Sequence, residues 1–261
     1  MEIKIIGCSG SFPGPDAAAS SYLVEADGFR LLMDLGAGAL GALQRYADLY
    51  AVDAVCISHL HGDHCLDLCS YSVARLFHPD GPKPRIPVYG PSQAEARLSQ
   101  ALAADPAQAT ADPGHGMTDA FSFAVITPGT FEIGPLRITA ARMNHPVETY
   151  GFRLEHGGRA LAYSADTGPA DALVDLARDA DVLLCEASFL EPADGGAADL
   201  PPGLHLTGRQ AGQHADRAGT GELVLTHLVP WNDRDRTLDE ADGAFSGESY
   251  LASPGLRLVL D

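Results

Sequence analysis

Apolar and polar positions follow one another along the chain in a pattern that predicts short strands and amphipathic helices from end to end. Apolar runs of strand length occur at residues 2–6, 21–25, 29–34, 54–58, 86–89, 121–126, 136–143, 150–154, 160–164, 182–185, 223–226 and 256–260. Apolar positions at helical spacing occur at residues 39–50, 66–77, 92–102, 169–178, 208–217 and 238–244. Strand-rich runs precede helices in both halves. This order favours two sheets packed face to face, with helices outside, over a doubly wound parallel sheet.

Turn-forming residues separate several of these elements. Asp27-Gly28 predicts a hairpin between the strands at 21–25 and 29–34. Residues 104–119 are rich in Ala, Asp, Pro and Gly and predict a loop or a lid. Because no shift in composition divides the chain, we expect one domain over residues 1–261.

Composition indicates a globular protein of the cytoplasm. Hydrophobic residues make up 46% and charged residues 20% of the 261 residues. No apolar run has the length needed to cross a bilayer, and the N-terminus lacks the basic start and long apolar stretch of a signal peptide. The five cysteines are odd in number and lie mostly in apolar stretches, which favours reduced thiols over a disulfide framework. We therefore expect a cytoplasmic location and no membrane partner.

The formal net charge of −18 limits the choice of partners. An extended nucleic acid is bound by many Lys and Arg side chains at its phosphates, and this composition argues against such a surface. A small anionic substrate is still compatible, because surface charge is screened beyond roughly 8 Å and two divalent cations would leave a local site positive. We expect a small anionic substrate, and the formation of a homodimer stays open.

Four residues with metal-binding side chains fall within the run HLHGDH at residues 59–64. The preceding run at 54–58 predicts a buried strand, so these side chains follow a strand end, which is a rigid place to hold a metal. Imidazole and carboxylate together suit zinc, or manganese or iron in a mixed site. A solvated histidine-rich loop is the alternative, and the density of ligand-type residues argues against it. Cys65 and Cys69 are possible extra ligands by type, but their spacing also fits one buried helical face.

Three further residues of ligand type follow predicted strands, namely His145, Asp166 and His227. Singly, each has another interpretation, such as a strand-end histidine or, for Asp166, a helix N-cap. Their joint occurrence at strand ends favours one site shared with residues 59–64. The run LVLTHL at 223–228 also repeats the pattern of VCISHL at 55–60, a strand that ends in hydroxyl-His-Leu. If the halves are related by a pseudo-twofold axis, both histidines point into one cleft.

Together these residues resemble the metallo-β-lactamase-fold hydrolases, in the ligand set of their dinuclear phosphodiesterase and ribonuclease Z members. The resemblance covers essentially the whole chain and implies an α/β fold, the αββα four-layer sandwich of two mixed β-sheets flanked by helices. It implies two Zn²⁺ ions, with Mn²⁺ or Fe as alternatives. Asp34 resembles the family's structural aspartate beside the site. The implied ligands are His59, His61 and His145 for one ion, Asp63, His64 and His227 for the other, and Asp166 as the bridge.

Glu186 and His205 resemble the carboxylate and histidine pair of ribonuclease Z-like phosphodiesterases. A histidine held by a carboxylate can stay protonated near neutral pH and donate to a departing alkoxide. The alternative is a buried strand-end Glu and a His that precedes a helix, neither with a catalytic task. The implied mechanism uses a metal-bridging hydroxide that attacks phosphorus. In this mechanism Asp63 orients the nucleophile and His205 protonates the leaving oxygen.

The substrate is a choice between a small phosphodiester and tRNA. Ribonuclease Z enzymes carry a flexible basic arm, commonly between the positions that match His145 and Asp166, and here two predicted strands fill that interval. This favours a small phosphodiester such as a cyclic nucleotide, and residues 65–71 and 161–168 look like a branch of the superfamily that includes atypical cyclic-nucleotide phosphodiesterases. The alternatives are a ribonuclease Z-like tRNA 3′-processing endonuclease, a metal-dependent thioesterase or lactamase, and a non-enzymatic metal or redox-binding protein.

Overall fold

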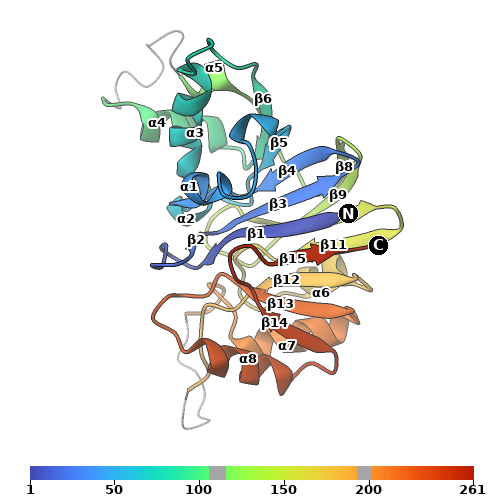
Figure 1. Ribbon diagram of the computed structural model, residues 1–261. Helices are drawn as coiled ribbons and strands as arrows, with labels where there is room; N and C mark the ends of the chain where they lie inside the picture. The colour runs from blue at the N-terminus through green and yellow to red at the C-terminus, as the bar shows by residue number, and fades with distance from the viewer. Residues whose placement is uncertain (106–115, 193–200) are drawn as a thin grey trace.

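The computed structural model describes residues 1–105, 116–192 and 201–261, and two β-sheets dominate it (Figure 1). The first sheet consists, in spatial order, of β15 (Arg257–Val259), β1 (Glu2–Ser9), β3 (Ser21–Ala26), β4 (Phe29–Met33), β5 (Ala54–Cys56), β6 (Ile86–Gly90) and β7 (Phe121–Val125), with β2 (Ala18–Ala19) paired to β1. The second consists of β14 (Glu248–Leu251), β13 (Glu222–Thr226), β12 (Val182–Glu186), β11 (Arg159–Tyr163), β10 (Tyr150–His156), β9 (Leu136–Arg142) and β8 (Gly129–Ile133).

Both sheets are mixed. In the first, β1, β3 and β4 pair antiparallel while β4 to β7 pair parallel. In the second, β8 to β11 pair antiparallel and β11 to β14 pair parallel. The predicted hairpin joins β3 and β4 through Asp27 and Gly28, which both have positive φ. Neighbouring parallel strands end at the same edge of their sheet, so the segments that follow them meet there.

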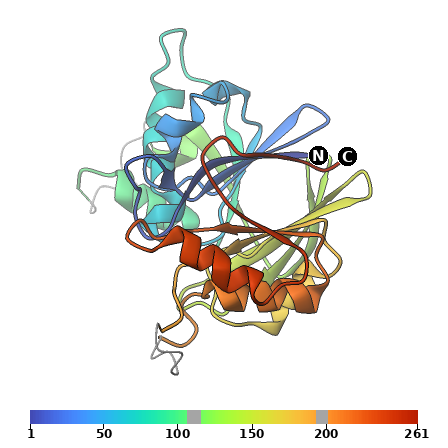
Figure 2. The ribbon, with the colours of Figure 1, turned by 60° about the horizontal axis from the view of Figure 1, so that its bottom comes forward.

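Helices cover the outer face of each sheet. Figure 2 shows α7 (Gly208–Ala218) and α8 (Arg234–Asp242), in orange and red, against the second sheet. Apolar residues of these helices pack on the sheets in two clusters, one for each outer face. The helices of the first half are α1 (Ala39–Leu43), α2 (Gly62–Cys65), α3 (Asp67–Leu76), α4 (Ala94–Leu102) and α5 (Met117–Ala120). Those of the second half are α6 (Asp171–Ala177), α7 (Gly208–Ala218) and α8 (Arg234–Asp242).

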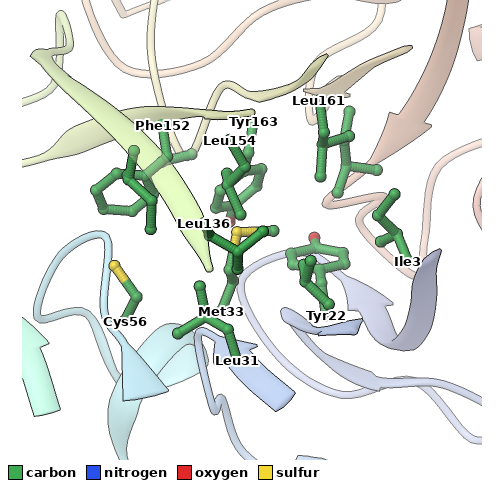
Figure 3. Close-up of a cluster of buried hydrophobic side chains, with 14 of the residues drawn as sticks. Ile3, Tyr22, Leu31, Met33, Cys56, Leu136, Phe152, Leu154, Leu161 and Tyr163 are labelled. Carbon is green, nitrogen blue, oxygen red and sulfur yellow. The ribbon is translucent and has the colours of Figure 1, made fainter. Parts of the chain in front are cut away.

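The hydrophobic core lies between the two sheets (Figure 3). Strand side chains alternate between the two faces of a sheet, so each strand supplies one set to this inner layer and the other to the helices. Tyr22 and Met33 come from the first sheet, and Phe152 and Tyr163 from the second, all with at most 1% of their surface exposed. The order helix, sheet, sheet, helix confirms the predicted αββα sandwich.

The differences from the predicted elements fall on weakly apolar segments. The pattern does not predict β8 or β14, which are the edge strands of the second sheet and are half exposed. The helix predicted at 39–50 ends at Leu43, and a 3₁₀ turn at Leu49–Ala51 follows, with Asp48 accepting from the amide of Tyr50. Of the loop predicted at 104–119, residues 106–115 lie outside the described residues and α5 occupies the end. Across the described residues, every helix is too short or too polar to cross a membrane.

Candidate metal centre

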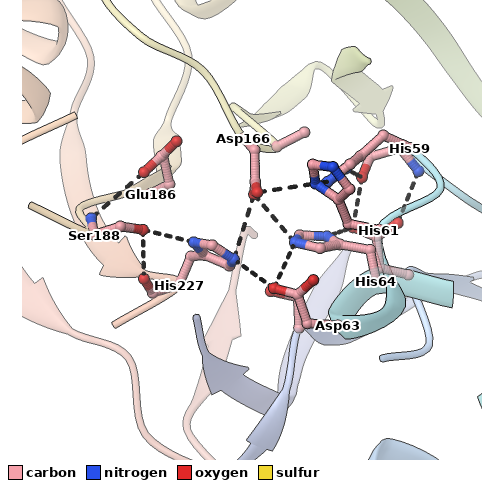
Figure 4. Close-up of polar contacts among 12 residues, drawn as sticks. His59, His61, Asp63, His64, Asp166, Glu186, Ser188 and His227 are labelled. Carbon is pink, nitrogen blue, oxygen red and sulfur yellow. Dashed lines mark hydrogen bonds and ion pairs between the residues drawn. The ribbon is translucent and has the colours of Figure 1, made fainter. Parts of the chain in front are cut away.

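The seven predicted metal ligands come together at the edge where strands of both sheets end, and Figure 4 labels all of them except His145. The run at 59–64 follows β5 and continues into α2, with His61 at the helix N-cap. In the second sheet, His145 follows β9, Asp166 follows β11 and His227 follows β13. The side chains of His59, Asp166 and His227 are at most 2% exposed. Residues separated by well over a hundred positions therefore meet because both sheets end at the same place.

The first group of ligand atoms belongs to three histidines. The Nε2 atom of His59 lies 3.1 Å from Nδ1 of His61, and Nε2 of His145 lies 3.3 Å from the same Nδ1. Oδ2 of Asp166 is 3.5 Å from His59 Nε2 and 4.0 Å from His145 Nε2. These ligand atoms all lie within 4.8 Å of one another, a spacing that one cation can span.

The second group consists of Asp63, His64 and His227. Oδ2 of Asp63 lies 3.1 Å from Nε2 of His227 and 3.7 Å from Nε2 of His64. Oδ1 of Asp166 is 3.1 Å from His64 Nε2 and 3.5 Å from His227 Nε2. The two carboxylate oxygens of Asp166 therefore face different groups, which is the arrangement of a ligand that bridges two cations.

The outward-facing nitrogens of four histidines are already engaged. His64 Nδ1 lies 2.8 Å from Asp34, His227 Nδ1 2.6 Å from Ser188, His145 Nδ1 2.9 Å from the carbonyl of Leu204, and His59 Nδ1 3.1 Å from Ser58. A partner at Nδ1 fixes the ring and leaves Nε2 as the acceptor that faces the cluster, as metal-bound histidines require. His64 Nε2 and Asp166 Oδ1 are buried and lie 3.1 Å apart as an ion pair, and neither makes a hydrogen bond within the described residues. The donor set therefore fits a metal ion.

The protonation states agree with this interpretation. Burial, reinforced by neighbouring imidazoles, holds the pKa of His59 well below its usual range, and burial also lowers the pKa of His61 and His145. These rings are therefore neutral, which is the ligand form. Burial also acts to lower the pKa of His64, but the carboxylates of Asp166 and Asp34 outweigh it and raise that pKa well above the usual value. The carboxylates around the second group therefore favour a positive charge there, which a metal ion would supply.

Asp34 holds one metal-binding ring in place through hydrogen bonds. It follows β4 with φ of 55° and is fully buried. Its Oδ1 accepts from the amide of Ser58 at 2.7 Å, and its Oδ2 accepts from the Ser58 hydroxyl, His64 Nδ1 and the Tyr163 hydroxyl, each at 2.8 Å. Tyr163 ends β11, so one carboxylate connects a metal-binding ring with both sheets.

Glu186 and His205 form the predicted pair beside this centre. Glu186 ends β12 and is fully buried, and its Oε1 accepts from His205 Nδ1 at 3.0 Å and from the amide of Thr167 at 2.6 Å. Burial acts to lower the pKa of His205, but the charge and hydrogen bond of Glu186 raise it to about 9. The ring lies 5.3 Å from that of His227, and its Nδ1 is 4.0 Å from Asp166. This position suits a proton donor, and it also permits His205 to act as a ligand with Asp166 and His227.

The supporting residues Ser188 and Tyr163 are not predicted by the sequence pattern. Ser188 binds His227, and only its place after β12 and the fold of the sheets bring it there. Ser58 has a local signal, because the hydroxyl-His-Leu pattern places a hydroxyl directly before His59. The matching Thr226 binds the Tyr22 hydroxyl at 2.8 Å instead, so the two repeats differ in their contacts.

An exposed aromatic pair lies on the loops next to His227. Ser9 and Leu228 form a parallel bridge, and a side chain at Gly10 would meet the backbone of His227, so the two loops are packed closely. Phe12 and Trp231, which follow on these loops, have ring centroids 4.9 Å apart, and Trp231 is 75% exposed. Both rings therefore lie on loops that adjoin His227.

Comparison with known proteins agrees with this fold and site. The family model for the β-lactamase superfamily domain matches residues 30–228. The metallo-β-lactamase fold protein YhfI of Bacillus subtilis is 32% identical over 258 residues, 98% of either chain, and its crystal structure superposes with a TM-score of 0.82 at 30% identity over 98% of both chains. The chain therefore belongs to the β-lactamase superfamily, as a metallo-β-lactamase-fold hydrolase with a His and Asp cluster able to bind metal.

Two further relatives place the chain among others of the superfamily. An uncharacterized protein of Mycobacterium tuberculosis is 43% identical over 249 residues, which cover 95% of this chain and 88% of that protein. A ribonuclease Z of Halorubrum lacusprofundi is 29% identical over 305 residues, which cover 98% of this chain and 96% of that enzyme.

Proposed function

We propose that this protein hydrolyses a small phosphodiester, such as a cyclic nucleotide, with two divalent cations, zinc being the expected metal and manganese or iron the alternatives. The observation that carries the proposal is the position of Asp166, whose two oxygens face two separate ligand groups, with the Glu186–His205 pair beside it. Two-metal sites and a protonated histidine are the parts that phosphoryl-transfer hydrolysis needs.

When bound, the metal ions would lower the pKa of a water molecule and offset the charge on the phosphoryl oxygens. Asp63 is 12% exposed at the second group, where its carboxylate can accept a hydrogen bond from the attacking water and orient it. Glu186 occupies Nδ1 of His205, which leaves Nε2–H to donate to the leaving oxygen. With a pKa of about 9, His205 carries that proton at neutral pH.

A tRNA 3′-processing activity like that of ribonuclease Z is the second candidate, favoured by the 29% identity to the Halorubrum enzyme. Two observations argue against it. β10 and β11 are joined directly through Gly157 and Gly158, which leaves no basic arm between His145 and Asp166. The net charge of −18 also disfavours a long polyanion. A thioesterase or lactamase is disfavoured because the proton on His205 suits a departing alkoxide.

Metal analysis followed by a substrate panel tests the proposal. We expect about two zinc ions per chain and hydrolysis of bis(p-nitrophenyl) phosphate and cyclic AMP, but of neither a thioester, a cephalosporin nor a tRNA precursor. His205→Ala should keep its metal and lose turnover roughly 10²-fold or more. The control His78→Ala changes a histidine that packs on Tyr50 and belongs to none of the ligand groups, and it should change neither. A fully loaded wild-type protein that hydrolyses no phosphodiester would overturn the proposal.

A further inference from the structure

A cavity of about 430 Å³ opens beside the first ligand group, between the start of α2, the helix α4 and the β9–β10 connection. Its volume lies in the range of small-molecule sites. Its lining residues include Leu60, His61, Gln93, Arg97, Val147 and Glu148.

His61 connects this cavity with the metal centre. Its Nδ1 belongs to the first ligand group, and the same residue also lines the cavity. The cavity therefore adjoins the first ligand group through His61. A phosphodiester whose phosphorus lies at the centre can therefore place one of its substituents in the cavity.

The walls define the chemistry of that substituent. Leu60 and Val147 supply apolar surface, and Val147 is 37% exposed. The guanidinium of Arg97 makes no ion pair or hydrogen bond with the described residues, so its donors are available. Glu148, in contrast, is held by the hydroxyls of Ser92 at 2.6 Å and Tyr150 at 2.8 Å.

The charges of the cavity favour a neutral ligand group. The Ser92 and Tyr150 hydrogen bonds, together with Arg142 at 3.9 Å, outweigh burial and lower the pKa of Glu148, so its carboxylate is ionised and lines the same cavity as the charged Arg97. A second phosphate would meet this carboxylate and be repelled. A flat heterocycle fits better, because its faces pack on aliphatic side chains and its edge atoms accept from a guanidinium.

We propose that this cavity binds the nucleobase of the substrate, with Leu60 and Val147 against the ring and Arg97 donating to its acceptor atoms. The inference rests on the proposed function, because it assigns the substrate class of that site as nucleotides and names Arg97 as a specificity-determining residue. Arg97 touches the base and takes no part in the reaction at phosphorus.

Calorimetric binding to the metal-loaded protein tests this inference without relying on turnover. AMP, GMP and ribose 5-phosphate share a phosphate and a ribose, and only the first two carry a base. We expect the wild type to bind AMP or GMP about tenfold or more tighter than ribose 5-phosphate. Arg97→Ala and Val147→Trp, which remove the donor and fill the cavity, should reduce that ratio to below about threefold. Arg45→Ala, an exposed arginine at a different cavity, should keep it.

The outcomes separate the two proposals. Equal binding of AMP, GMP and ribose 5-phosphate by the wild type would overturn the nucleobase site, whatever phosphodiesters the protein hydrolyses. A ratio that survives in both Arg97→Ala and Val147→Trp would also overturn it. A ratio that depends on Arg97, in a protein that hydrolyses no phosphodiester, would support the nucleobase site and refute the proposed function.

Discussion

The substitution Asp34→Asn tests whether one buried carboxylate holds both the sheets and the metal ligand His64 in place. Asp34 accepts four hydrogen bonds with its two oxygens. Asparagine has nearly the same shape but presents an amide NH₂ in place of one oxygen. If its oxygen keeps the bond from the Ser58 amide, its NH₂ faces three groups that had donated to the carboxylate.

The cost follows from which of these groups can adjust. The hydroxyls of Ser58 and Tyr163 can rotate, but His64 can accept at Nδ1 only if its proton moves to Nε2, the nitrogen that faces the cluster. One or two buried donors left unpaired cost about 1–3 kcal/mol each. We therefore expect a loss of about 1–6 kcal/mol, against the roughly 5–15 kcal/mol that stabilises a domain. Metal affinity should fall about 10–100-fold, because His64 loses the partner that fixes its tautomer.

Urea unfolding followed by far-UV circular dichroism measures the first effect, and metal content after dialysis measures the second. The matched control is Asp53→Asn in the turn before β5, where an exposed carboxylate accepts one hydrogen bond, from the Arg30 amide at 2.8 Å. We expect that control to lose less than about 1 kcal/mol and to keep its metal. If Asp34→Asn matched the control in both measurements, the role assigned to the carboxylate would be wrong.

Three other perturbations probe the centre. Gly10→Ala would place a methyl group 2.4 Å from the backbone oxygen of His227 and should lower both metal content and thermal stability. The control Gly41→Ala, whose methyl group would meet no atom within 4 Å, should lower neither. Equal metal content in the two variants would contradict this prediction. Because the pKa of His205 is raised to about 9, turnover should hold through neutral pH and fall as pH rises through about 9. In Glu186→Gln only Asp166 still opposes the lowering of the His205 pKa by burial, so the fall should move to lower pH, and an unchanged pH–rate profile refutes the pairing. Removal of metal with EDTA should lower the Tm by several degrees and zinc should restore it, because a cation that binds only the folded protein stabilises the folded state. An unaltered Tm argues against a bound metal.

Local sequence predicts the candidate site well because its residues sit where buried strands end. A short apolar run followed at once by a ligand-type residue, as at His59 and His227, needs no long-range information to be noticed. Two such runs in one chain, with Asp166 after a third, already indicate a shared edge. The structure brings these residues together, and which of them bind metal stays a prediction that metal analysis can test.

The remaining features depend on pairings that local sequence does not encode. β8 and β14 are edge strands, each with one neighbouring strand, and they carry few apolar residues, so the pairing with that neighbour defines them as strands. Arg97 lies on an amphipathic helix, and its sequence position gives no sign of a binding role. It lines a cavity only because α4 packs beside the β9–β10 connection. The contact of Ser188 with His227 likewise needs β12 and β13 to be neighbours.

Trp231 gives the molecule a built-in optical reporter. It is the single tryptophan of the chain, and it lies beside Phe12 on the loop that follows His227. The Trp231 side chain is already 75% exposed, so its surroundings change little on denaturation. Its fluorescence emission should therefore change little when the protein unfolds. A molecule that binds next to His227 and contacts the indole would instead shield or quench it, so fluorescence should report binding at the loop after His227 in unlabelled protein.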